Sequence, residues 1–194
     1  KYNPTNKQNP GLFKDLNYTI EKLRYAIFKD NETQADHYFN KLEHELVFLK
    51  NNWPTNLPKA IIHADLFQDN IFFIKEKILG VIDFYFSCND FYSFEIAICF
   101  NALCFDGQKD NLSFNVTKAK NFINGYSSIR NLLDNERENI KVLSQGAALR
   151  FLLTRVFDAL NTVEGAIVKV KDPLEYLKRL EFHKNSKNYE DYFF

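Results

Sequence analysis

The feature that most constrains this chain is a change in its hydrophobic period, which coincides with a group of prolines. Between residues 12 and 27, and again between 38 and 49, apolar side chains recur three and four positions apart. This spacing predicts two amphipathic helices that break near residues 30–31 and form a helical hairpin. Pro54 and Pro58 then end helix formation, because proline disfavours the helical conformation of the residue before it.

Short strands replace helices between these prolines and about residue 90. Three apolar runs, at residues 60–62, 71–74 and 78–82, predict short buried strands. Only Lys75-Glu76-Lys77 separates the last two, so they should form a tight antiparallel hairpin. If the turn is centred on Glu76, residue 71 faces residue 81 and residue 70 faces residue 82.

Helical spacing returns beyond Asp90. It predicts helices at about residues 90–105, 115–130, 135–162 and 172–184. The last begins at Asp172-Pro173, where proline suits the first turn. The predicted fold class is therefore α+β, a mostly helical body with one small β-hairpin.

The domain organisation follows from these elements. Residues 1–10 are polar with two prolines and are expected to be a lead-in or linker. Residues 11–194 are expected to form one domain with three parts: a helical hairpin (11–52), a loop with the β-hairpin (59–84) and a helical subdomain (90–184).

Composition excludes several classes of protein. The chain has 25 Lys and Arg against 25 Asp and Glu, so no positive field favours binding to nucleic acid or an anionic membrane. The longest apolar run, at residues 96–105, is far short of the roughly 20 residues that a membrane span needs. Cys88, Cys99 and Cys104 form no C-x-x-C pair, which favours reduced thiols in a cytoplasmic protein and no zinc site.

Two acids and an amide flank the predicted hairpin. The chain reads I-H-A-D-L-F-Q-D-N-I through residues 62–71 and G-V-I-D-F through residues 80–84. With the pairing above, Asn70 and Asp83 become neighbours at the open end of the hairpin, where opposed residues have Cβ atoms about 4.5–5.5 Å apart. An amide oxygen and a carboxylate at this spacing can bind one hard cation, and Mg²⁺ is the natural candidate.

Asp65 lies on the same loop, five residues before Asn70. Phosphoryl transfer needs a group beside the metal that orients an attacking hydroxyl and accepts its proton, and Asp65 suits this role. Taken singly, Asp65, Asn70 and Asp83 could each be an ordinary turn residue, because Asp and Asn favour turns. Their joint spacing around a hairpin favours catalysis.

The histidines are not expected to carry protons. His63, two residues before Asp65, belongs to the catalytic group, where it should support the loop through hydrogen bonds. His37, His44 and His183 lie in helical segments without a partner pattern and are expected on solvated surfaces.

The spacing H-x-D-x-x-x-x-N, followed by an apolar hairpin that ends in I-D-F, resembles the catalytic and metal-binding segments of the protein-kinase-like fold. Ala64 stands in place of the arginine of protein kinases, and no A-P-E sequence follows Asp83, so the chain resembles the small-molecule branch. Six blocks resemble bacterial homoserine kinases of the aminoglycoside-phosphotransferase-like type: residues 57–67, 69–73, 80–90, 95–99, 146–155 and 171–177.

The resemblance implies a function and a place in the fold. It implies that Asp65 is the catalytic base, that Asn70 and Asp83 hold Mg²⁺, and that ATP phosphorylates L-homoserine to O-phospho-L-homoserine in threonine biosynthesis. The chain is similar to the mostly helical C-terminal lobe of this fold. Residues 1–50 contain no G-x-G-x-x-G sequence, so we expect the N-terminal lobe that clamps the nucleotide to be absent from this chain, and the isolated chain to be inactive.

Homoserine is a zwitterion with a hydroxyl tail, so its site needs an acid for the ammonium group and an arginine or amide donors for the carboxylate. Tyr85, Asn89 and Asp90 follow the hairpin and are candidates to border this acceptor pocket.

Two arginines are further candidates for substrate binding. Arg150 and Arg155 lie in an otherwise apolar helix, where an unpaired charge is costly, so each should face a cleft or a carboxylate. The alternative for both is an internal ion pair with Asp158 or Glu164 on the same helix.

Two other functions stay open at this point. The first is another small-molecule hydroxyl kinase of the same fold, such as a choline or aminoglycoside kinase; choline would need several aromatic side chains around its quaternary ammonium group. The second is an inactive lobe that acts only as a binding module.

Overall fold

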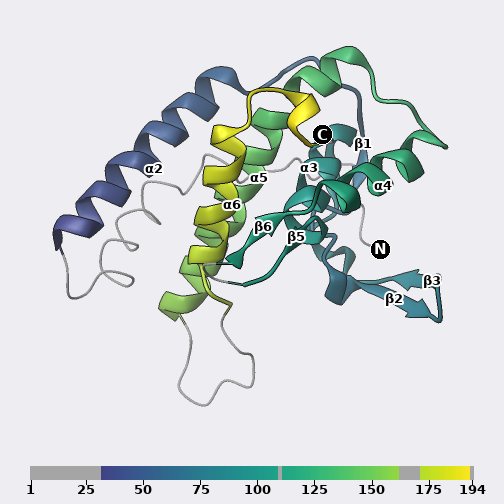
Figure 1. Ribbon diagram of the computed structural model, residues 1–194, viewed down its shortest axis with the longest axis horizontal. Coiled ribbons are helices and arrows are strands. Elements are labelled where there is room, and N and C mark those ends of the chain that lie inside the picture. Colours follow the sequence, from purple (N-terminus) through teal and green to yellow (C-terminus); the bar gives the residue numbers. More distant parts are fainter. Residues whose placement is uncertain (1–31, 109–110, 162–170, 193–194) are drawn as a thin grey trace.

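The computed structural model describes residues 32–108, 111–161 and 171–192 (Figure 1). The expected lead-in and the first helix of the expected hairpin, at residues 12–27, lie outside the described residues. In the described part the fold is α+β, as predicted. Its helices are α2 (Glu32–Asn52), α3 (Tyr92–Leu103), α4 (Val116–Ser127), α5 (Asp134–Asn161) and α6 (Leu174–Asn185).

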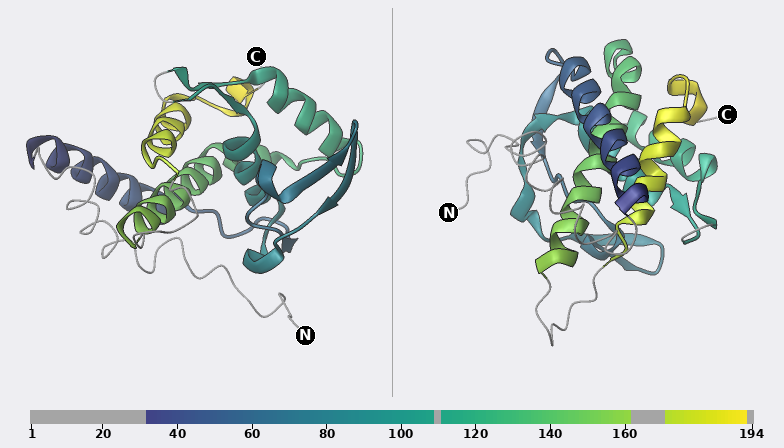
Figure 2. Two further views of the ribbon diagram at one scale, coloured as in Figure 1. Left: turned by 90° about the horizontal axis from the view of Figure 1, so that it is seen from below. Right: turned by 90° about the vertical axis from the view of Figure 1, so that its left-hand side faces the viewer.

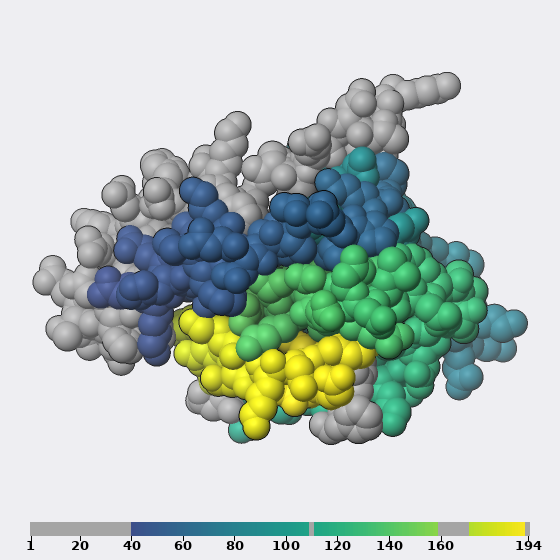
Figure 3. Space-filling model, turned by 90° about the horizontal axis from the view of Figure 1, so that it is seen from above, coloured from purple at the N-terminus to yellow at the C-terminus, as the bar shows by residue number. Residues whose placement is uncertain are grey.

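Helix α5 is the centre of the helical body, because both α3 and α6 pack against it. Helices α2, α5 and α6 lie side by side across one face of the molecule (Figures 2 and 3). Eight of the twelve residues of α3 are buried, as expected for a helix that is apolar on all sides. None of the helices in the described ranges combines the length and apolar character needed to cross a membrane.

Two paired strands frame the segment that carries the predicted site. β1 (Lys59–Ile62) pairs antiparallel with β4 (Cys88–Phe91), with Ile62 opposite Cys88. Strand β4 was not predicted, because its four residues lack an alternating pattern and run directly into α3. The pairing brings the two ends of residues 63–87 together, so the segment with the loop and the hairpin begins and ends at neighbouring strands. A third pair, β5 (Phe105–Asp106) and β6 (Ser113–Phe114), connects α3 with α4.

The predicted hairpin is present as β2 (Ile71–Ile74) and β3 (Lys77–Val81). Ile71 faces Val81 as predicted, although the turn is tighter than expected, with Ile74 opposite Lys77. A bulge leaves Leu79 unpaired and restores the register at the open end.

The expected burial of the hairpin strands is wrong. The side chains of Phe72, Phe73, Ile74, Ile78 and Leu79 are between 50% and 67% exposed. The hairpin projects from the body (Figure 1), and a ribbon of two strands has too few neighbours to cover either of its faces.

His183 is buried in the helical body, contrary to the expected surface position. Its Nε2 donates to Asn101 Oδ1 at 3.1 Å and its Nδ1 accepts from the Tyr192 hydroxyl at 3.0 Å. This assignment holds because the amide nitrogen of Asn101 already donates to two backbone oxygens, which leaves its oxygen as the acceptor. Burial lowers the pKa of His183 to about 3, so a neutral ring ties α6 to α3.

The three cysteines are buried and form no disulfide, in agreement with the expected reduced thiols. Burial raises the pKa of Cys99 and raises that of Cys104 to about 12. The Cys99 and Cys104 thiols therefore stay protonated and pack as small apolar groups.

Candidate active site

The loop between β1 and β2 is held by a clamp on the backbone of one residue, Ala64, whose N–H and carbonyl groups are both bound by side chains. The Ala64 N–H donates to Glu95 Oε2 of α3 at 2.8 Å, and the Ala64 carbonyl accepts from Arg150 Nη1 of α5 at 2.6 Å. Ala64 has a φ of 63°, in the left-handed region that costs an alanine about 1–3 kcal/mol. Such a conformation persists only where its surroundings enforce it, and two helices do so here, directly before Asp65.

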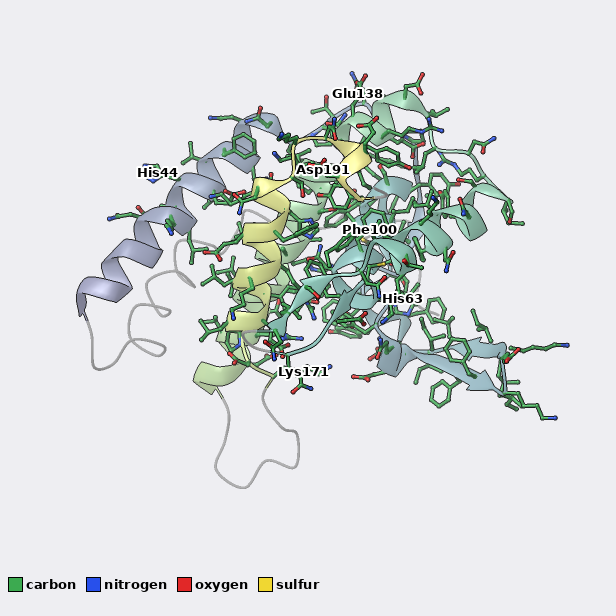
Figure 4. All side chains as sticks on the ribbon, in the orientation of Figure 1. His44, His63, Phe100, Glu138, Lys171 and Asp191 are labelled. Carbon is green, nitrogen blue, oxygen red and sulfur yellow. The ribbon has the colours of Figure 1, made fainter. Side chains whose placement is uncertain are left out.

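His63 connects this loop to the end of the hairpin, and Figure 4 shows it at the base of the projecting strands. Its Nδ1 accepts from the Asp65 N–H at 3.3 Å, and its Nε2 donates to the Ile82 carbonyl at 2.8 Å. The partners fix the neutral tautomer, because an N–H can only donate and a carbonyl can only accept. His63 therefore joins the segments that carry Asp65 and Asp83, and its ring also lies 4.7 Å from that of Phe84.

Asn70 is oriented by two hydrogen bonds at the open end of the hairpin. Its side-chain nitrogen donates to the main-chain carbonyl of Asp65 at 2.8 Å, and its own main-chain carbonyl accepts from the Ile82 N–H at 3.0 Å. The second bond confirms the predicted register of residues 70 and 82. The Asn70 Oδ1 points away from the first bond and carries no hydrogen bond within the described residues.

Asp83 follows Ile82 with a left-handed φ of 61°, a conformation that aspartate tolerates better than most residues. Its side chain is exposed, whereas Asn70 is buried. The two predicted oxygen ligands, Asn70 Oδ1 and the Asp83 carboxylate, thus come from the two strand ends at the open end of the hairpin. Among the described residues no cluster of three or more His, Cys, Asp or Glu side chains suits a metal ion. The pair fits Mg²⁺, which takes one or two protein oxygens and completes its shell with water and phosphate.

Asp65 has the surroundings of a general base. Burial raises the pKa of its carboxyl group, and the nearby negative charge of Asp83 raises it further. The positive charges of Arg150 and Lys171 oppose this rise. Within the described residues no hydrogen bond occupies the Asp65 carboxylate, so it can accept a bond from a bound hydroxyl.

Arg150 lies between the loop and the start of β4. Its guanidinium lies 5.7 Å from the ring of Phe86 and 4.8 Å from that of Phe151. Burial lowers the pKa of Arg150, and the charges of Asp65, Glu95 and Asp90 oppose that fall. Of the predicted substrate residues, Arg150 is thus affected by the charges of both Asp65 and Asp90, and Asp90 Oδ1 also accepts a hydrogen bond from the Phe91 N–H at 2.8 Å.

The other predicted substrate residues are placed differently. Tyr85 is 71% exposed, and Asn89 is exposed in β4 opposite Ile61. Arg155 forms an ion pair with Glu175 at 2.9 Å and donates to the Asp172 carbonyl at 2.9 Å. This arrangement favours the internal ion pair for Arg155, with a partner on α6 that the sequence did not single out.

Two residues with contacts in the site were not predicted. Glu95 was noted only as part of a sequence block, although an acid inside an apolar helix is the same signal that drew attention to Arg150. Lys171 reaches the loop from a position 102 residues away, with its Nζ 2.9 Å from Asp69 Oδ2. No local pattern in the sequence indicates such a contact.

Most of this chain is similar to known proteins. The model of the phosphotransferase enzyme family, APH, matches residues 4–130, which include Asp65, Asn70 and Asp83. A homoserine kinase from Rhodopseudomonas palustris is 48% identical over 172 residues, which cover 87% of this chain and 52% of that protein. A homoserine kinase from Xanthobacter autotrophicus is 51% identical over 148 residues, 76% of this chain and 45% of the relative. A third homoserine kinase, from Agrobacterium fabrum, is 49% identical over 171 residues, which cover 86% of this chain and 52% of that protein.

The chain spans about half the length of these curated relatives. The family model nevertheless matches well over half of the chain, including the clamped loop and the hairpin. The resemblance predicted from the H-x-D-x-x-x-x-N spacing is thereby confirmed, and the chain belongs to the phosphotransferase enzyme family.

Proposed function

We propose that the full-length protein is a homoserine kinase, which transfers the γ-phosphoryl group of ATP to the hydroxyl of L-homoserine. The product is O-phospho-L-homoserine, an intermediate of threonine biosynthesis. The reaction class rests on one observation: a clamped loop presents the Asp65 carboxylate beside Asn70 and the end of the hairpin that carries Asp83. The acceptor rests on relatives named homoserine kinase that are 46–51% identical to this chain.

In the proposed reaction Asp65 accepts a hydrogen bond from the homoserine hydroxyl and takes its proton as the oxygen attacks the γ-phosphorus. The raised pKa of Asp65 makes it a stronger base. His63 and the clamp on Ala64 hold the loop, so that the Asp65 carboxylate keeps its position beside the attacking hydroxyl. Asn70 and Asp83 hold Mg²⁺, which when bound neutralises charge on the phosphates.

Arg150 and Asp90 are the proposed recognition residues for the two ends of the amino acid. Arg150 would donate to the substrate carboxylate with the part of its guanidinium that does not contact Ala64. Asp90 would attract the ammonium group from β4, and the exposed Tyr85 and Asn89 would border the pocket. Arg155 instead holds the connection between α5 and α6.

A substrate panel tests the proposal. The full-length gene product, with ATP and Mg²⁺, should phosphorylate L-homoserine in preference to choline, an aminoglycoside and L-threonine, as measured by ADP release and product mass. Asp65→Asn is the matched inactive control. Turnover of choline or an aminoglycoside without turnover of homoserine would show instead a different hydroxyl kinase of the same family.

The chain of 194 residues can be assayed for the same activity by itself. Given ATP, Mg²⁺ and homoserine, it should show no turnover, because the relatives that carry the activity are about twice as long. Turnover at the full-length rate would contradict the proposed need for a separate nucleotide-clamping lobe. We place the activity in the cytoplasm, which agrees with three free buried thiols.

A further inference from the structure

Lys171 lies at the edge of the catalytic loop, although it belongs to the segment that leads into α6. Its Nζ forms an ion pair with Asp69 Oδ2 at 2.9 Å and lies 5.6 Å from the centre of the Phe67 ring. Asp69 and Phe67 both belong to the loop between β1 and β2, which carries Asp65 and Asn70. Figure 4 labels Lys171 below the lower end of α6 and His63 at the base of the hairpin.

The backbone that carries Lys171 is firmly held. Arg155 donates to the carbonyl of Asp172 and to Glu175, and its guanidinium lies 4.4 Å from the ring of Tyr176. The Leu174 N–H donates to Asp172 Oδ1 at 2.9 Å. Residues 172–176 are thus fixed to α5, which also fixes the backbone next to Lys171.

The end of the Lys171 side chain is much less constrained. The Lys171 and Asp69 side chains are 57% and 74% exposed, and an ion pair this exposed contributes only about 0–1 kcal/mol to stability. The pair therefore adds little to the fold. A more highly charged anion could replace Asp69 as the partner of Lys171 at small cost.

The charges around the loop show what such an anion would be. Asp65, Asp69 and Asp83 are negative, and the positive charges of Arg150 and Lys171 act on the Asp65 carboxyl group. Arg150 is largely buried and bound to the Ala64 carbonyl. Lys171 is the exposed cation of this set. A phosphoryl group that approaches Asp65 adds negative charge, and preorganised cations beside it are a major source of rate.

We propose that Lys171 is a further catalytic residue, whose ammonium group leaves Asp69 and binds the phosphoryl group during its transfer to the acceptor hydroxyl. The inference rests on the proposed kinase activity. The hydroxyl oxygen forms its bond to the γ-phosphorus, the bond from that phosphorus to the bridging oxygen of ADP breaks, and the hydroxyl proton goes to Asp65. Lys171 donates hydrogen bonds to the non-bridging oxygens and exchanges no proton.

Four versions of the full-length gene product separate this role from a structural one: the wild type, Lys171→Met, Asp69→Asn and the double variant. With saturating ATP, Mg²⁺ and homoserine, Lys171→Met should lower kcat about a hundredfold, the effect of removing one such donor. Asp69→Asn should stay within about threefold of the wild type, and the double variant should match Lys171→Met. Lys171→Arg should recover part of the rate.

The opposite pattern would overturn the proposal. If the ion pair only holds the loop in place, Lys171→Met and Asp69→Asn lower kcat by the same factor and the double variant is no worse than either. Retention of kcat by Lys171→Met within about twofold would also exclude the role. Lys118→Met, which removes another exposed Lys–Asp ion pair, between α4 and Asp106 of β5, is the matched control and should keep full activity.

Failure of the proposed function gives a different result. If the wild type transfers phosphate to another alcohol and not to homoserine, the acceptor assignment is wrong, while the same four versions still test Lys171 with that alcohol. Thermal unfolding of each variant should give the wild-type midpoint, because the side chains involved are exposed. Lys171→Gln provides a second neutral variant, should Lys171→Met unfold.

Discussion

The loop between β1 and β2 and the hairpin that follows it differ in how the rest of the molecule holds them. Residues 63–70 contain a left-handed alanine, and partly buried side chains from α3 and α5 bind its N–H and its carbonyl group. Residues 71–74 and 77–81 form two short strands with mostly apolar side chains, yet most of these side chains are exposed. The difference indicates that order at the site comes from bonds to the helical body, and that the hairpin contributes mainly through its first and last residues.

The largest expected effect comes from the loop itself. Asp65→Asn should lower kcat of the full-length protein about a thousandfold, because the amide cannot accept the hydroxyl proton. Thermal unfolding should be unchanged, since no hydrogen bond among the described residues occupies this carboxylate. A variant that keeps most of its activity would remove Asp65 from the role of base.

The second effect tests the clamp on Ala64. Glu95→Ala leaves the buried Ala64 N–H without its acceptor, and the free energy of unfolding should fall by about 1–3 kcal/mol. Denaturant unfolding measures this change, and kcat should fall with it. Glu95→Gln is the matched control, because its amide oxygen can still accept the bond. Equal stability of Glu95→Ala and the wild type would contradict the importance of the clamp.

The third effect concerns the connection between the two regions. His63→Gln cannot satisfy both the Asp65 N–H and the Ile82 carbonyl, so the variant should lose about 1 kcal/mol of stability. We also expect a lower kcat, since Asp65 and Asp83 would no longer be held together. His44→Gln, on the exposed side of α2, should change neither quantity.

The smallest effect is expected in the middle of the hairpin. Leu79→Thr alters the bulged residue, which is 67% exposed, and should change the free energy of unfolding by at most about 0.5 kcal/mol. Leu149→Thr, at a buried position of α5, should cost several times more in the same denaturant titration. If Leu79→Thr proves as damaging as Leu149→Thr, the hairpin is as much a part of the core as the helices are.

Local patterns were sufficient to predict the helices of the body and the register of the hairpin. The spacing of residues 71–81 around one short turn determines which residues face each other, and the bulge at Leu79 compensates for the shorter turn. The order along the chain also placed Asp65, Asn70 and Asp83 around one hairpin end, as the Ile82–Asn70 bond supports.

What local patterns missed depends on contacts between distant residues. Glu95 binds a peptide 31 positions away, Arg150 one 86 positions away, and Lys171 a side chain 102 positions away. A single sequence contains no measure of these separations in space. The burial of His183 was missed for the same reason, because its partners Asn101 and Tyr192 lie on other elements. The exposure of the hairpin was missed because apolar strands are usually covered, and here no described element covers them.

The pairing of β1 with β4 has a consequence for how such a protein can change over evolutionary time. Because residues 63–87 begin and end at one pair of neighbouring strands, the segment is a cassette, that is, an insertion whose two ends meet at one place in the helical body. Lengthening or shortening the hairpin tip would leave the packing of α3, α5 and α6 in place. New acceptor preferences could therefore arise by exchanging residues within the cassette and along its rim, without a redesign of the scaffold beneath it.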